Sequence, residues 1–129
     1  MADVGGDPLQ RGPKADVAHI RQEAVGDVTV FVVENENIYA KQAEEMADAI
    51  RGGIRSADRP RILVDLSAAE FTCSALMGLL IDLHKSAAEK GGDLKICVTG
   101  GHAAYTMKLV KLNHIIDMAG DRQSLIDVF

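Results

Sequence analysis

The sequence predicts an α/β domain built on a central, mostly parallel or mixed β-sheet, with its elements in the order β-β-α-β-α-β-α-β-α. The 129 residues are the length of one ordinary domain, and 47% of them are apolar, so the chain can bury a core. Short runs of branched residues alternate with longer segments of helical periodicity. Strands separated by helices need crossover connections, and these connections favour parallel pairing.

The first part of the chain predicts a leader followed by a hairpin. Residues 1–16 contain several glycines and prolines without periodicity, which is typical of a flexible leader, so we place the domain at residues 17–129. The run at 17–25 alternates weakly and predicts an edge strand, whereas VTVFVV at 28–33 predicts a strong strand. The Gly26-Asp27 turn between them indicates that the two strands pair.

A helix and a buried strand are expected next. Apolar residues recur at three- and four-residue steps from Ala40 to Ile54, which predicts an amphipathic helix with Asn37 as its N-cap. Pro60 makes continuation of this helix unfavourable. RILVDL at 61–66 then predicts a buried strand.

The second half of the chain repeats the alternation of helix and strand. A helix with leucines on its inner face is expected from Ser74 to about Glu89, and glycines follow it. The remaining elements are expected as a strand at 93–99, a helix at 102–112, a short strand at 115–118 and a short helix at 123–129.

Charge and cysteine content exclude several classes of protein. Lys and Arg number 14 and Asp and Glu number 19, for a net charge of -5, and no basic cluster is dense enough for a nucleic-acid binder. Two cysteines make no disulfide framework. The longest apolar run is much shorter than the roughly 20 residues that span a bilayer. We therefore expect a cytoplasmic protein that binds neither nucleic acid nor membrane, and we expect the amphipathic run YTMKLVKL to pack against the domain.

The stretch EFTCSALMGLL at 70–80 places a polar step between a predicted strand and a predicted helix. Ser74 fits the N-cap of that helix, a role whose loss typically costs ~1 kcal/mol. The same position suits a phosphorylated hydroxyl, because helix amides and the helix dipole favour an anion. Hydrolysis by Ser74 is disfavoured, because the Gly-x-Ser-x-Gly elbow and a diagnostic His and acid pair are missing.

The other candidate groups have structural explanations. Cys73, near a helix start, is either a reactive thiolate or a small apolar filler, and Cys97 is expected in the core. No segment matches a dinucleotide or Walker motif, and the histidines lack metal-ligand spacing, so we expect no enzyme, cofactor or metal site. NENIY at 35–39 predicts a solvated turn or, alternatively, part of a docking surface.

Element order, length and the run ILVDLSAAEFTCSALMGLLIDLHKSAAEKGGDLKICV resemble the STAS domain of bacterial anti-sigma factor antagonists, over roughly residues 17–129. In that family the loop usually has the sequence Phe-x-Asp-Ser-Ser/Thr-Gly-Leu-Gly, and a serine kinase that is itself the anti-sigma factor phosphorylates its first hydroxyl residue. Ser74 falls on that position, and Phe71 and Gly78 are kept. The family residues are replaced by Cys73, Ala75, Leu76 and Met77.

The resemblance implies a partner-switching module. When Ser74 is unphosphorylated, the module would bind a serine-kinase anti-sigma factor, which is a histidine-kinase-like ATPase. A PP2C-type phosphatase would remove the phosphoryl group after phosphorylation. A homodimer is compatible with the resemblance. The altered loop supports a second interpretation, a scaffold without phosphorylation, and a third is a ligand-binding STAS module. The expected partner-binding residues are Asn35, Asn37, Tyr39, Thr72, Cys73, Ser74, Ala75 and Met77.

Overall fold

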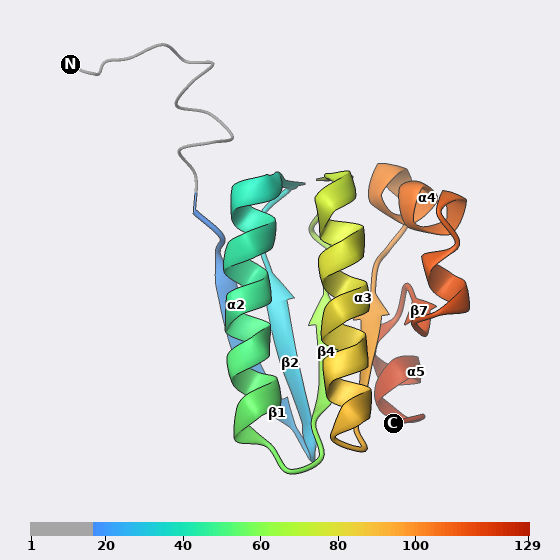
Figure 1. Ribbon diagram of the computed structural model, residues 1–129. Helices are drawn as coiled ribbons and strands as arrows, with labels where there is room; N and C mark the ends of the chain where they lie inside the picture. Colours follow the sequence, from blue (N-terminus) through green and yellow to red (C-terminus); the bar gives the residue numbers. More distant parts are fainter. Residues whose placement is uncertain (1–16) are drawn as a thin grey trace, which may run out of the picture.

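The computed structural model describes residues 17–129, which form a five-stranded mixed sheet, a separate pair of short strands, and helices (Figure 1). The predicted leader, residues 1–16, lies outside the described residues. In chain order, the elements are β1 (Ile20–Val25), β2 (Val28–Val33), β3 (Asn37–Ile38), α2 (Ala40–Ser56), β4 (Arg61–Asp65), β5 (Phe71–Thr72), α3 (Ser74–Glu89), β6 (Asp93–Cys97), α4 (Gly101–Leu109), η1 (Leu112–His114, a 3-10 helix), β7 (Met118–Ala119) and α5 (Arg122–Ile126).

The large sheet has the strand order β1-β2-β4-β6-β7. Strands β1 and β2 pair antiparallel from Ile20 opposite Val33 to Val25 opposite Val28, which confirms the predicted hairpin. The other three pairings, β2 with β4, β4 with β6 and β6 with β7, are parallel. The predicted fold class, a mostly parallel mixed sheet with helical crossovers, is confirmed.

Helices α2 and α3 lie side by side on one face of the sheet (Figure 1). Their buried residues recur at helical spacing, and the largest share of the core lies between these helices and the sheet. Complete burial of a single leucine such as Leu80 stabilises the fold by about 2 kcal/mol. Gly53 lets α2 approach the sheet closely, because a Cβ at that position would lie 2.7 Å from the Cζ atom of Phe31.

The opposite face of the sheet carries a smaller apolar cluster, which includes Cys97 and the α5 residue Leu125. Burial raises the pKa of Cys97 to about 11, so its thiol stays protonated and apolar, as expected of a core residue. Lys95 is also buried on this face. Its Nζ atom contacts Asp117 at 2.6 Å and lies 5.1 Å from the centre of the Phe129 ring.

The predicted N-caps of α2 and α3 are both wrong, that of α2 by two residues and that of α3 by one. Asn37 belongs to strand β3, so Tyr39 occupies the N-cap of α2, and the side chain of Gln42 accepts a hydrogen bond from its amide at 2.9 Å. Cys73 occupies the N-cap of α3, which makes Ser74 the first helical residue. The strand pairings of the preceding loops decide both boundaries, and these pairings override local capping preference.

The last predicted strand is displaced along the chain. The run 115–118 was expected to be extended, but η1 extends the helical region to His114, and pairing with β6 begins only at Met118. Ile116 is buried while Ile115 is half exposed, because the chain turns between them and the beginning of β7.

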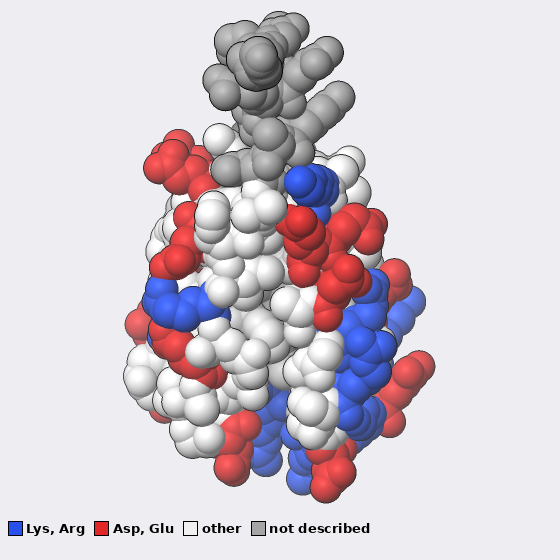
Figure 2. All heavy atoms as spheres, turned by 90° about the vertical axis from the view of Figure 1, so that its left-hand side faces the viewer, with Lys and Arg blue, Asp and Glu red and all other residues white. Residues whose placement is uncertain are grey.

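Charged groups on the surface are mixed. On the face shown in Figure 2, acidic side chains lie beside basic ones, and Arg21 forms ion pairs with both Glu23 and Glu34. Within residues 17–129, no three His, Cys, Asp or Glu side chains gather into a group that could hold a metal ion. In the same part of the chain, no helix combines the length and the apolar character needed to cross a membrane.

Candidate functional site

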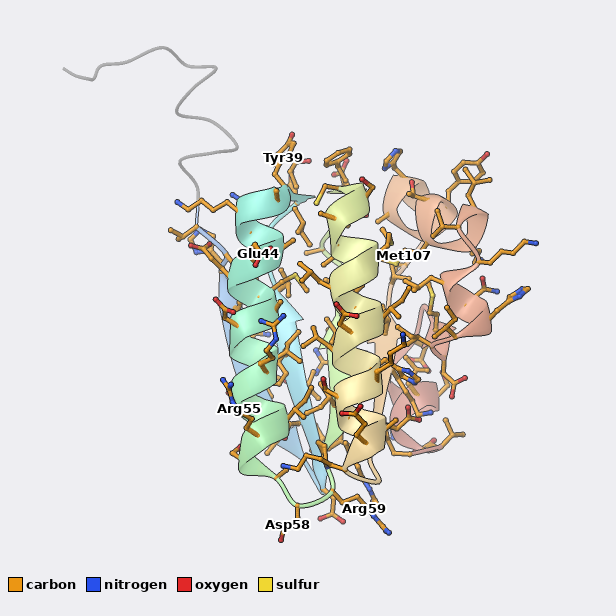
Figure 3. All side chains as sticks on the ribbon, viewed as in Figure 1. Tyr39, Glu44, Arg55, Asp58, Arg59 and Met107 are labelled. Carbon is orange, nitrogen blue, oxygen red and sulfur yellow. The ribbon has the colours of Figure 1, made fainter. Side chains whose placement is uncertain are left out.

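Three helices begin at the same end of the molecule, which is uppermost in Figure 1 and which we call the upper end. Parallel strands β2, β4 and β6 all finish there, so the connections that follow them lead into α2, α3 and α4 at that end. Figure 3 shows Tyr39 projecting from this end, whereas Asp58 and Arg59 lie at the opposite end. In parallel sheets, the loops at this edge usually carry the functional residues.

The short strands β3 and β5 tie the first two of these loops together. They pair parallel, with Asn37 opposite Phe71 and Ile38 opposite Thr72. The Glu36 carbonyl oxygen accepts a hydrogen bond from the amide of Phe71 at 3.1 Å, and the Ile38 carbonyl oxygen accepts one from the amide of Cys73 at 2.9 Å. The backbone just before Ser74 is therefore fixed by the chain that precedes α2.

Three rings form a row across the upper end. The ring centres of Tyr39 and Phe71 are 5.1 Å apart, and those of Phe71 and His102 are 5.4 Å apart with nearly parallel planes. Tyr39 precedes α2, Phe71 precedes α3 and His102 lies in the first turn of α4. The row therefore connects the beginnings of all three helices into one surface.

Ser74 lies beside this row with its side chain exposed. Within the same helical turn, Ala75 is exposed, whereas Leu76 and Met77 turn into the core with exposed fractions of 1% and 7%. Cys73 is half-buried against the core. We define the Ser74 surface as the accessible residues of this region, namely Asn37, Tyr39, Phe71, Cys73, Ser74, Ala75 and His102.

Three residues that were expected to bind a partner are buried instead. The side chain of Asn35 accepts a hydrogen bond from the His19 amide at 2.7 Å and donates one to the Val17 carbonyl oxygen at 3.0 Å, so it fixes the chain that enters β1. Thr72 is 2% exposed, and its hydroxyl group has no hydrogen-bond partner among the described residues. Met77 packs in the core. The side chains of Asn35, Thr72 and Met77 are therefore not accessible at the Ser74 surface.

An ion pair anchors the first part of the loop that leads to Ser74. Asp65, at the end of β4, accepts hydrogen bonds from the Ser67 amide at 3.0 Å and from the Ser67 hydroxyl group at 2.5 Å. Its second oxygen accepts from Arg122 of α5 at 2.6 Å, and Arg122 also contacts Glu23 at 2.9 Å. Burial raises the pKa of Asp65, but the hydrogen bonds from Ser67 and Arg122 outweigh it and hold the pKa below its ordinary value.

This lowered pKa predicts an acid-dependent contribution to stability. Above the ordinary carboxyl pKa of about 3.9, Asp65 is ionised in both states and its contacts stabilise the folded one. As the pH falls through the lower folded-state pKa, that contribution is lost. At pH 7 we expect Asp65→Asn to lower the free energy of unfolding by about 2 kcal/mol.

Urea denaturation of both proteins from pH 7 to pH 2.5 measures this effect. The difference between the wild-type chain and Asp65→Asn should shrink as the pH falls below about 3.9, because the wild-type carboxyl group also loses its charge. A difference that stays constant over the whole range would show that the charge of Asp65 contributes nothing.

Two of these features, the stacking of His102 and the ion pair of Asp65, depend on contacts between distant parts of the chain. His102 was recognised as one of several scattered histidines, but its stacking on Phe71 depends on the placement of α4 beside the loop before α3. Asp65 and Arg122 are separated by 57 positions, and only the position of α5 beneath the sheet brings them together. A charged residue at the end of an apolar strand, as in ILVD, was the one available hint of a buried ion pair.

Solved structures with the same fold include several anti-sigma factor antagonists. One from Mycobacterium paratuberculosis is 20% identical, with a TM-score of 0.76 over 85% of this chain and 92% of its own. A STAS domain protein from Planctomyces limnophilus is 19% identical, with a TM-score of 0.72 over 84% and 96%. The Bacillus protein SpoIIAA in its phosphorylated form is 15% identical, with a TM-score of 0.63 over 84% and 97%. These likenesses establish the fold.

Comparison of sequences gives the family. No curated protein matches this chain. The family model of the STAS domain, however, matches residues 19–125, which is most of the chain and includes both the Ser74 surface and the Asp65 ion pair. The chain therefore belongs to the STAS domain family.

Proposed function

We propose that this protein is an anti-sigma factor antagonist that exchanges partners according to the phosphorylation state of Ser74. The observation that carries the proposal is the exposed Ser74 side chain at the first turn of α3, beside a row of three rings on the upper end. Unphosphorylated, the Ser74 surface binds a serine kinase that is also an anti-sigma factor, and binding frees the sigma factor or another regulator.

The geometry suits a modification that changes binding without unfolding the domain. The first-turn amides of a helix lack partners within the helix, and the helix dipole is positive there, so a phosphoryl group on Ser74 is tolerated by α3. The group nevertheless adds roughly −1.5 to −2 charges to the surface. Against a closely packed partner, such a charge costs several kcal/mol through like-charge repulsion and through desolvation of the phosphoryl group.

The residues that depart from the family loop are compatible with the same phosphorylation switch, and they make the beginning of α3 stiffer. Leu76 occupies the place of a family glycine, and its buried side chain packs the beginning of α3 onto the core. Cys73 replaces an aspartate, which removes one negative charge next to Ser74. The kinase that modifies this chain therefore recognises a less acidic loop than the family usually presents, and a PP2C-type phosphatase reverses the reaction.

The altered loop also favours a second candidate function. With Cys73 and Ala75 in place of a carboxylate and a second hydroxyl group, the chain can serve as a scaffold that binds regulators through the same surface without being phosphorylated. Both candidate functions use the Ser74 surface, and they differ in whether Ser74 accepts a phosphoryl group.

Incubation with kinase and ATP tests the proposal. Each histidine-kinase-like serine kinase of the source genome would be purified, beginning with any encoded beside this chain, and the products measured by intact mass. We expect one added phosphoryl group on the wild-type chain and none on Ser74→Ala. Thr99→Ala, which removes another exposed hydroxyl group at the upper end together with its hydrogen bond to the Ser67 carbonyl oxygen, should be modified normally.

The outcomes separate the two candidate functions. A kinase that binds the chain but never phosphorylates it would support the scaffold. Phosphorylation that persists in Ser74→Ala would place the modification elsewhere, and the proposed switch would be wrong.

A further inference from the structure

Helix α4 and the turn after it expose an unusual concentration of large apolar side chains. Tyr105 and Leu109 are each 66% exposed, Val110 is 55% exposed and Ile115 is 49% exposed. The sequence suggested that this amphipathic run packs against the domain, but only part of it does, through residues such as Met107 and Leu112. Clustered exposed apolar residues of this kind mark interaction surfaces.

Two lysines lie among these apolar side chains, and the acidic residue that follows the patch, Asp117, is paired with Lys95 at 2.6 Å. Lys108 and Lys111 are exposed, and the whole segment 94–116 contains neither Asp nor Glu in a chain of net charge -5. Lys111 adopts a left-handed backbone conformation, with φ of 62°, which costs roughly 1 kcal/mol relative to glycine. We define the α4 surface as Tyr105, Lys108, Leu109, Val110, Lys111 and Ile115.

The α4 surface is continuous with the Ser74 surface. His102, in the first turn of α4, stacks on Phe71, and Tyr105 follows one helical turn later. A standard protein interface buries about 800 Å² on each partner, a patch about 30 Å across. Helix α4 has nine residues, which is about 14 Å. A partner of this size that covers Ser74 and His102 therefore reaches onto α4.

We infer that the α4 surface is a second docking site for the partner that binds at Ser74, and that the partner covers it with an amphipathic segment carrying acidic and apolar side chains. This inference rests on the function proposed above. The apolar side chains supply burial, and the two lysines attract the acidic segment. The contact lies to one side of the phosphorylation site, so it persists in part when Ser74 is modified.

The positive charge of the α4 surface argues against two other binding partners, a second copy of this chain and an anionic membrane. A symmetric contact between two copies of this chain would gather four lysines, Lys108 and Lys111 from each copy, in one interface, and like charges brought together there carry a cost. An anionic membrane would gain only about 1 kcal/mol from each lysine, and polybasic membrane-binding segments carry about 4–8 such residues.

Affinity measurements with the kinase that phosphorylates Ser74 test this inference. Lys108→Glu/Lys111→Glu should weaken binding about tenfold or more, and Leu109→Ser/Val110→Ser should also weaken it. The matched control is Lys85→Glu/Arg59→Glu, which makes the same change in net charge with exposed residues outside the α4 surface. The control should bind as the wild-type chain does. Added salt should weaken wild-type binding more steeply than binding of Lys108→Glu/Lys111→Glu.

The arms of the experiment distinguish this inference from the proposed function. If Ser74→Glu weakens binding but both α4 variants bind normally, only the inference falls. If the wild-type chain binds no kinase, both fall. Binding of the wild-type chain, but not of the lysine variant, to vesicles of phosphatidylcholine and phosphatidylglycerol would identify a membrane as the occupant and overturn the inference. Dimerisation in sedimentation that Leu109→Ser/Val110→Ser abolishes would also overturn it.

Discussion

Ser74→Glu is expected to weaken binding of the kinase anti-sigma factor about 100-fold, which corresponds to about 2.7 kcal/mol. The carboxylate adds a negative charge at the first turn of α3, where the side chain is exposed and lies beside the row of rings. The helix accepts the charge because its dipole favours an anion at this end. A kinase packed closely against Ser74 would not tolerate the added charge. Titration calorimetry with both proteins measures the change.

A matched variant separates position from net charge. Ala88→Glu adds the same charge at the other end of the same helix, on an exposed residue, and should leave kinase binding within about twofold of wild type. Both variants should remain folded, because neither side chain enters the core. Equal binding by Ser74→Glu and the wild-type chain would mean that the partner does not cover Ser74.

Gly92→Ala is expected to lower the free energy of unfolding by about 3 kcal/mol or more. A Cβ atom at this position would lie 1.9 Å from the Pro60 carbonyl oxygen. That oxygen also accepts a hydrogen bond from the Asp93 amide at 2.9 Å, and Asp93 begins the pairing of β6 with β4 opposite Arg61. Neither backbone can move away without breaking the central strand pair, so the clash cannot be relieved locally.

Gly78→Ala is the control for this substitution. Gly78 lies inside α3 with nothing within 4 Å of an added Cβ atom, so alanine there should raise the free energy of unfolding by about 0.5–1 kcal/mol. Chemical denaturation of the two variants should therefore give changes of opposite sign. A Gly92→Ala protein as stable as wild type would show that the β4 and β6 connection is more adaptable than this geometry implies.

The sequence predicted the long elements well because their signals are local. The periodicity of α2 and α3, the branched runs of β2 and β4, and the turn at Gly26 each depend on neighbours in the chain. Helix α3 covers the expected range, although Cys73 rather than Ser74 is its N-cap. The strands β3 and β5 were missed. Each has two residues, too few for any periodicity, and each exists only because the other lies beside it.

The candidate site was predicted in part for the same reason. The polar step at Ser74 between a strand and a helix was visible in the sequence, and the structure places that side chain at the surface. Asn35 and Thr72 were expected there as well, since polar residues in a loop usually face solvent. Hydrogen bonds from distant backbone bury Asn35, and pairing with β3 turns Thr72 inward. Such long-range contacts leave no pattern in the local sequence.

The Ser74 surface and the α4 surface are expected to contribute differently to partner binding. Under the proposed function, phosphorylation would change the charge of the Ser74 surface, whereas the α4 surface would keep the same apolar and basic character in both states. A partner held at both sites can lose most of its affinity when Ser74 is phosphorylated and still be retained weakly nearby. Dephosphorylation would then restore the full contact without a new search for the partner.

The most direct test compares the chain phosphorylated at Ser74 with the unmodified chain, each measured for its free energy of unfolding and for its affinity for the same kinase held without ATP. We predict stabilities that agree within about 1 kcal/mol and an affinity at least about 100-fold weaker for the phosphorylated chain. Equal affinities, or a phosphorylated chain that has lost its fold, would contradict the account.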